Sequence, residues 1–144
     1  YFRRGEPYAD VPYTHYADLQ ELARASDYLI VIVPGGPDTQ HLINRDVLKA
    51  LGPKSYLINV ARGSVVDEKA LVASLLESEI AGAGLDVFED EPNVPAELMS
   101  LDSVVLTPHI GSGTYETRQA MADLVFANVS AYFADGSLVT PVQL

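Results

Sequence analysis

Continuous apolar runs alternate along the chain with segments in which apolar residues recur at helical spacing. The four continuous runs are rich in β-branched or small residues and have strand length, so each predicts a buried strand. These predicted strands are 28–33, 55–60, 81–86 and 103–106. The predicted helices are 18–25, 44–51, 68–77 and 114–133. Asn44 and Asp67 fit the N-caps of the second and third helices.

This order of elements predicts an α/β fold in which a parallel sheet carries helices on both faces. A doubly wound sheet of the Rossmann type opens with Gly-x-Gly-x-x-Gly at a strand–helix turn, and the 144 residues hold no such motif. Gly82-Ala83-Gly84 has the first two glycines, but Val87 replaces the third and the segment lies inside a predicted strand. We therefore expect the later strands of a Rossmann-like sheet, beginning near the end of its second strand.

Composition narrows the classes of protein and site. Hydrophobic residues make up 48% of the chain and charged residues 20%, which is typical of a globular domain. No apolar run approaches the roughly 18 residues of a membrane span. The chain has no cysteine, which excludes disulfides and thiolate metal sites, and we expect a cytoplasmic protein without a metal. A formal charge of −11 argues against a nucleic-acid surface, which needs clustered lysine and arginine.

Three polar residues, Arg62, Glu91 and His109, come after the second, third and fourth predicted strands. A guanidinium binds carboxylate in bidentate geometry, and a histidine beside a carboxylate is a common acid–base pair. Taken singly, each has a plain alternative: an exposed arginine before a turn, a solvated acid and a structural histidine. Because the carboxyl ends of parallel strands converge on one edge of the sheet, the three together predict an active site there. His15 and His41 lack such a context and are interpreted as surface or local hydrogen-bonding residues.

The segments that carry these residues resemble the three signature segments of the D-isomer-specific 2-hydroxyacid dehydrogenases. The segments are 59–67 (Asn-Val-Ala-Arg-Gly-Ser-Val-Val-Asp), 82–92 and 107–112. Their order and spacing are also similar, with 29 positions from Arg62 to Glu91 and 18 more to His109. Segments 33–39 and 123–128 most resemble the glyoxylate/hydroxypyruvate reductase branch of the family.

The resemblance implies a role for each matching residue. Arg62 corresponds to the residue that binds the substrate carboxylate and 2-oxo oxygen, His109 to the proton donor to that oxygen, and Glu91 to the acid paired with the histidine. Asp86 corresponds to the partner of the nicotinamide carboxamide, and Ser112 to a secondary substrate contact. The other matching positions line the cofactor mostly through backbone, and they are Pro34, Val60 and Gly111.

Arg3 and Arg4 favour NADP as the cofactor, with NAD as the alternative. NAD enzymes of this fold place an acid at the end of the second strand for the ribose 2′-hydroxyl, whereas NADP enzymes offer arginine to the 2′-phosphate. The two arginines stand at that place, and no acid does. The alternative interpretation is an ordinary exposed basic pair.

The resemblance implies an oxidoreductase that reduces a small 2-oxo acid, such as glyoxylate or hydroxypyruvate, to the D-2-hydroxy acid, and it implies a homodimer. A dinucleotide-sensing corepressor-like protein and an inactive fragment are the alternatives. Residues 1–112 are expected to be part of an NAD(P)-binding domain, and 113–144 to be a helix and tail that belong to or contact a substrate domain. Because the glycine-rich loop and most of the substrate domain lie outside the 144 residues, we expect these residues alone to be inactive.

Overall fold

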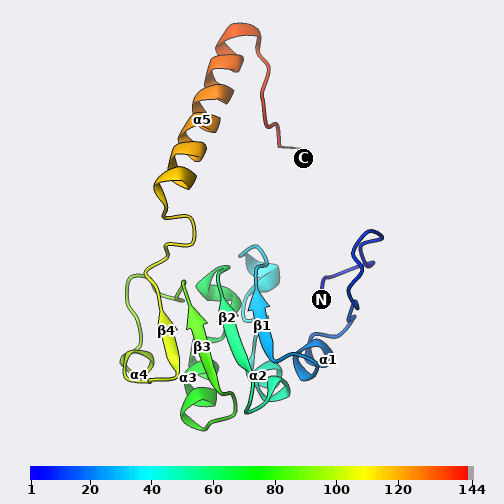
Figure 1. The fold of residues 1–144 in the computed structure, drawn as a ribbon, viewed down its shortest axis with the longest axis vertical. Coiled ribbons are helices and arrows are strands. Elements are labelled where there is room, and N and C mark those ends of the chain that lie inside the picture. The colour runs from blue at the N-terminus through cyan, green and yellow to red at the C-terminus, as the bar shows by residue number, and fades with distance from the viewer. Residues whose placement is uncertain (143–144) are drawn as a thin grey trace. The chain divides into compact units, whose positions relative to one another are not determined.

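The computed structural model describes residues 1–142 and divides into two compact units, Tyr1–Pro108 and His109–Leu144. Unit 1 is built on a four-stranded parallel sheet (Figure 1). Its strands are β1 (Tyr28–Val31), β2 (Tyr56–Asn59), β3 (Gly82–Leu85) and β4 (Val104–Leu106). They lie side by side in chain order, so that Ile58 is in register with Ile30 on one side and Gly84 on the other. All four predicted strands are confirmed, each shorter than its apolar run.

Each of the three longer helices of unit 1 is preceded by a residue whose side chain caps its N-terminus. The helices are α1 (Leu19–Arg24), α2 (Arg45–Leu51), α3 (Glu68–Leu76) and α4 (Ala96–Met99). Asp18, Asn44 and Asp67 each accept a hydrogen bond from a first-turn backbone N–H, at 2.9, 3.1 and 3.0 Å. Helices α1, α2 and α3 confirm the prediction. The short α4 and the two 3₁₀ turns, η1 (Pro37–Thr39) and η2 (Gly63–Val65), are too brief to leave a periodic pattern.

The predicted α/β fold with a parallel sheet is confirmed, and within unit 1 the helices cover one face of that sheet rather than both. Burial alternates along β1, where Leu29 and Val31 are 5% and 4% exposed while Tyr28 and Ile30 are 63% and 59% exposed. The reason is topological. The order β1-β2-β3-β4 steps in one direction only, and right-handed crossovers then place every connecting helix on the same face. Helices reach the second face beyond a reversal of strand order, and the described residues contain no such reversal.

The first three residues of strand β3 are small, and its neighbours approach it closely at both glycines. A Cβ on Gly82 would lie 2.3 Å from the backbone oxygen of Ser103, and one on Gly84 would lie 3.1 Å from the Ile58 side chain. Both glycines therefore serve the packing of adjacent strands. The Gly82-Ala83-Gly84 segment is a strand and not a phosphate-binding turn.

Unit 2 contains one long helix, α5 (Tyr115–Asp135). Thr114 caps it by accepting the Thr117 N–H at 3.2 Å, and Gly136 ends it with a left-handed φ of 79°. The predicted helix over 114–133 is confirmed and extends two residues further. In the part of the chain that the structure describes, no helix is both long and apolar enough to cross a membrane.

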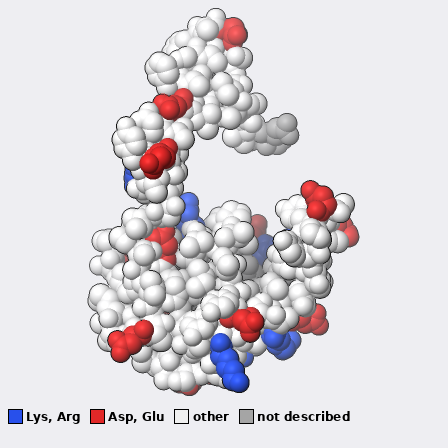
Figure 2. All heavy atoms as spheres, viewed as in Figure 1, with Lys and Arg blue, Asp and Glu red and all other residues white. Residues whose placement is uncertain are grey.

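Charged side chains are interspersed on the face drawn in Figure 2, and uncharged residues make up most of that face. The net charge of −11 is therefore not gathered there into one acidic surface. Large apolar side chains are exposed in both units, Ile32 (75%) and Phe133 (82%) among them.

Candidate active site

Arg62 lies in the turn that leaves the carboxyl end of β2. Asn59, only 1% exposed, fixes this turn, since its side-chain amide donates to the Arg62 carbonyl and its oxygen accepts the Ala61 N–H, both at 3.1 Å. Arg62 itself is exposed, and its Nη1 donates to the Ala61 carbonyl at 2.6 Å. A buried side chain thus sets the backbone shape that presents the guanidinium at the edge of the sheet.

The segment after β3 carries the two predicted acids, Asp86 and Glu91. Asp86 is 7% exposed, and the Thr107 hydroxyl donates to its Oδ1 at 2.5 Å, which supplies a donor that a buried carboxylate needs. Glu91 is exposed, and its Oε1 accepts the Phe88 N–H at 3.1 Å. The peptide bond between Glu91 and Pro92 is cis. Thr107, which follows β4, therefore holds Asp86, and the backbone amide of Phe88 holds Glu91.

The Arg62 turn and the Glu91 segment are in direct backbone contact. A Cβ on Gly63 would lie 1.9 Å from the carbonyl oxygen of Phe88 and 2.5 Å from the nitrogen of Glu89. Only glycine permits so close an approach. The segments that carry Arg62 and Glu91 therefore meet at one edge of the sheet, as the parallel topology predicts.

His109 is the first residue of unit 2 and has a left-handed φ of 53°. Histidine adopts this backbone region more readily than most residues do. The next residues form a turn in which the Ile110 carbonyl accepts the Gly113 N–H at 2.7 Å, and this turn contains Gly111 and Ser112. The predicted site residues of unit 2 thus lie in one short stretch before α5. That they form one active site with Arg62 and Glu91 stays a proposal.

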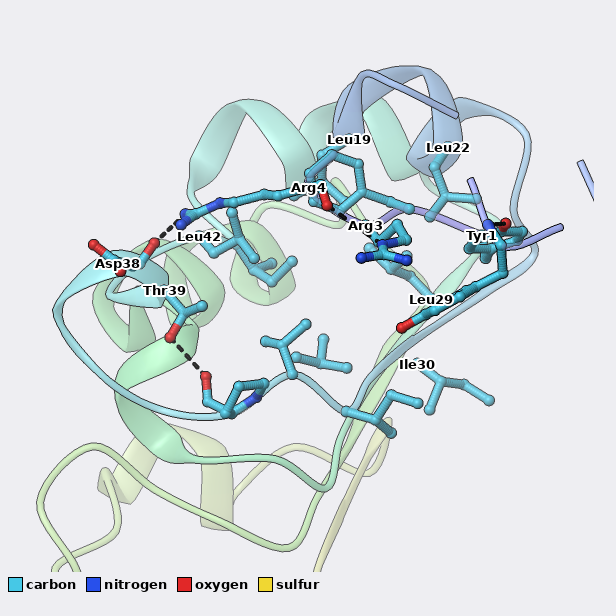
Figure 3. Close-up of a pocket in the computed structure, with 17 residues that line it drawn as sticks. Tyr1, Arg3, Arg4, Leu19, Leu22, Leu29, Ile30, Asp38, Thr39 and Leu42 are labelled. Carbon is cyan, nitrogen blue, oxygen red and sulfur yellow. Dashed lines mark hydrogen bonds between the residues drawn. The ribbon is translucent and has the colours of Figure 1, made fainter. Parts of the chain in front are cut away.

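A cavity of about 710 Å³ opens beside β1 in unit 1 (Figure 3). Its lining comes from the start of the chain, from α1 and β1, and from the segment that follows β1, and it includes Arg3, Arg4 and Pro34. The Thr39 hydroxyl donates to the Pro34 carbonyl at 2.7 Å and so fixes the loop at the carboxyl end of β1 (Figure 3). Val60 is 49% exposed at the end of β2 and does not line this cavity.

The two arginines of the cavity are held in different ways. Arg4 Nη2 donates to the Asp38 carbonyl, which ties Arg4 to η1. The Arg3 guanidinium carbon lies 4.0 Å from the centre of the Tyr8 ring, and its Nε donates to the Arg4 carbonyl at 3.3 Å. In Figure 3, Arg3 points to the middle of the cavity while Arg4 extends toward Asp38. A guanidinium stacked on an aromatic ring keeps its edge donors for an anion, so Arg3 is the better arranged of the two to bind phosphate.

The lining of this cavity fits one end of a dinucleotide. Its apolar walls, which include Leu22, Leu29 and Leu42, suit an aromatic base, and the Arg3 guanidinium suits a phosphate. A metal site is not indicated, because residues 1–142 contain no group of three His, Asp or Glu side chains that could hold an ion.

His41 is a residue whose contact sequence reasoning missed. It is half-exposed, as expected, but its Nε2 lies 2.8 Å from Oε1 of Glu89, which is 48 positions away and belongs to the segment that carries Glu91. His15 also bonds beyond its neighbours, since its Nε2 lies 3.3 Å from the Arg3 carbonyl. No local pattern could have predicted either contact, because each partner is distant in the chain.

Ion pairs fasten α2 to the end of α3 and the turn after it. Arg45 Nη2 donates to Glu77 and, at 3.1 Å, to Glu79. The hydrogen bond from Arg45 holds the pKa of Glu79 below its usual value, and the same bond raises the pKa of Arg45. Burial raises the pKa of Glu68, whose carboxylate accepts the Glu89 N–H at 3.2 Å. Of these, only the Glu68 contact touches the segment that carries Glu91.

Comparison with known proteins gives one consistent result. Residues 2–111 match the family model described as D-isomer specific 2-hydroxyacid dehydrogenase, NAD binding domain. Hydroxyphenylpyruvate reductase of Plectranthus scutellarioides is 54% identical over 142 residues, which are 99% of this chain and 45% of that protein. Glyoxylate reductase of Pyrococcus furiosus is 54% identical over 117 residues, which are 81% of this chain and 35% of that protein.

Among solved structures, the chain is similar to the NADPH-dependent glyoxylate/hydroxypyruvate reductase of Sinorhizobium meliloti in complex with NADP and malonate. The TM-score is 0.94 at 53% identity, over 99% of this chain and 44% of that one. Holo D-mandelate dehydrogenase of Rhodotorula graminis gives a TM-score of 0.92 at 35% identity, over 100% of this chain and 43% of that one. The chain thus spans less than half the length of the relatives that it matches.

Proposed function

The chain belongs to the family of D-isomer specific 2-hydroxyacid dehydrogenases, and from this premise we propose that the protein reduces a small 2-oxo acid to the D-2-hydroxy acid. The substrate class is that of glyoxylate and hydroxypyruvate, because relatives named for these substrates are about half identical to the chain. The single observation that carries the proposal is the backbone contact of Gly63 with Phe88, which joins the Arg62 turn to the segment holding Glu91.

The proposed residues supply charge and a proton. NAD(P)H contributes a hydride to the 2-oxo carbon, so negative charge grows on the 2-oxo oxygen. Arg62 binds the substrate carboxylate and stabilises that oxygen, since a charged donor acts most strongly where charge develops. His109 gives its proton to the oxygen, which completes the hydroxyl group. Glu91 is proposed as the acid that pairs with His109, the role that the family resemblance implies for it.

The test of this function is turnover by the full-length protein. We expect NADPH oxidation with glyoxylate and hydroxypyruvate, followed by its absorbance. Arg62→Ala should reduce kcat/KM by about 10²–10³-fold, the scale of losing one charge-stabilising donor. Exposed Arg24 on α1, which donates to Gln20 at 3.2 Å and does not line the cavity, gives the matched control Arg24→Ala with unchanged activity. Binding of NADPH without turnover of any 2-oxo acid would favour the dinucleotide-sensing alternative.

For the cofactor we propose NADP, with Arg3 as the main ligand of the 2′-phosphate and Arg4 in a supporting place. The stacking of Arg3 on Tyr8 supports this assignment, and so does the NADP in a relative of known structure. Arg3→Ala should raise KM for NADPH about tenfold or more, because a charged hydrogen bond contributes about 1.5–3 kcal/mol. KM for NADH should change little, since NADH has no 2′-phosphate. Equal increases for both cofactors would contradict the assignment.

The remaining proposals concern the nicotinamide end and the assembly. Asp86 is proposed to accept from the carboxamide, Pro34, Val60 and Gly111 to line the cofactor, and Ser112 to contact the substrate. Asp86 is buried directly after β3, where its carboxylate needs hydrogen-bond donors, and a carboxamide N–H is such a donor. A homodimer is proposed from the family resemblance, and sedimentation of the full-length protein tests it.

A further inference from the structure

His41 contacts both of the segments that carry proposed active-site residues of unit 1. It lies between η1 and α2, and its φ of 49° is left-handed. Its backbone N–H donates to the Ser64 carbonyl at 2.8 Å, two residues past Arg62. Its side-chain Nε2 lies 2.8 Å from Oε1 of Glu89, two residues before Glu91.

Glu89 is held from two sides, and this fixes the backbone that binds Glu91. Its side chain pairs with His41, and its N–H donates to Glu68 Oε2 at 3.2 Å. The preceding residue, Phe88, donates its N–H to Glu91 Oε1 at 3.1 Å, and its carbonyl group contacts Gly63. A movement of Glu89 therefore moves the amide that orients the Glu91 carboxylate.

We propose that His41 is a positioning residue, which acts through Glu89 to hold the Glu91 carboxylate in place beside the Arg62 turn. The inference rests on the proposed function of Glu91. The imidazole itself touches neither Arg62 nor Glu91 by any hydrogen bond described, and its effect is carried by the Glu89 backbone. The hydrogen bond from the His41 N–H to the Ser64 carbonyl fixes the position of the His41 backbone. Together with the His41–Glu89 pair, it links the turn after β2 to the segment after β3.

A simpler role for His41 is to adopt the left-handed turn. Asparagine accepts this backbone region as readily as histidine, but its side chain is too short to span the distance to Glu89. His41→Asn therefore keeps the turn and removes the pair. Glu89→Ala removes the pair from the other side, and Glu89→Gln keeps a neutral hydrogen bond to the imidazole. These three variants separate the backbone role from the side-chain role.

The experiment uses the full-length protein and two readouts. His41→Asn and Glu89→Ala should each lower kcat with hydroxypyruvate about three- to fivefold, the scale of losing one side-chain hydrogen bond, with KM for NADPH unchanged. Glu89→Gln should restore most of kcat, and the His41→Asn/Glu89→Ala double variant should be no slower than Glu89→Ala alone. In hydrogen–deuterium exchange, peptides covering 86–92 should exchange faster in the two disruptive variants.

Glu77→Ala is the matched control, because the Arg45–Glu77 pair is comparably exposed and has no contact with the segment 86–92 among those described. It should leave kcat and the exchange of 86–92 unchanged. Wild-type kcat in His41→Asn, or unchanged exchange of 86–92, would overturn the positioning role. A wild-type protein that turns over no 2-oxo acid would refute the proposed function instead, and exchange alone would then decide whether His41 anchors the segment.

Discussion

Replacing Gly63 by alanine tests the contact that joins the two halves of the proposed site. The new Cβ would lie 1.9 Å from the Phe88 carbonyl oxygen and 2.0 Å from its carbon, both backbone atoms. Real Cβ contacts are essentially never below 3.0 Å, so the two segments must separate by about 1.1 Å. Gly63 has no positive φ, so the effect of the substitution comes from this clash and not from backbone strain.

The separation of the two segments should affect catalysis more than folding. Overpacking in a close contact costs about 1–3 kcal/mol of stability, which leaves most of a full-length enzyme folded at 25 °C. A misplacement of catalytic groups by about 1 Å costs about 10²-fold in rate. We therefore expect Gly63→Ala to lower kcat/KM for hydroxypyruvate about a hundredfold, with a circular dichroism spectrum like that of the wild type.

Gly84→Ala provides the control in the same sheet. Its Cβ would lie 3.1 Å from Cδ1 of Ile58, the end of a flexible side chain that can turn away. NADPH oxidation at 25 °C should therefore stay within about threefold of the wild-type rate in this variant, because flexible neighbours absorb a small overlap. Gly63→Ala with a rate as close to wild type as that of Gly84→Ala would refute the claim that this contact holds Arg62 and Glu91 together.

Three further predictions concern catalysis, stability and the isolated chain. Glu91→Gln should lower kcat/KM for reduction, and an unchanged kcat/KM would remove Glu91 from the mechanism. Because Arg45 lowers the pKa of Glu79, this carboxylate stabilises the fold above its unfolded pKa of about 4.3 and loses that effect as pH falls. Glu79→Gln should therefore lower Tm at pH 7 but not at about pH 3, and a difference in Tm that does not depend on pH would contradict this. Residues 1–144 alone should show no turnover and no micromolar binding of NADPH in calorimetry, since the matched relatives are more than twice as long.

The sequence determined the local elements and the identity of the family. Strands, helices and their caps follow from apolar periodicity and from single side chains such as Asn44 and Asp67, because these signals act within a few residues. The resemblance rested on segments whose residues are adjacent in the chain, and the family match over residues 2–111 agrees with it.

The tertiary structure decided what depends on residues far apart in the chain. The single helical layer of unit 1 follows from strand order, which apolar runs do not encode. The approach of Gly63 to Phe88 and the bond from His41 to Glu89 join positions 25 and 48 residues apart. Such contacts depend on how parallel strands bring their carboxyl ends together, so no local sequence pattern predicts them.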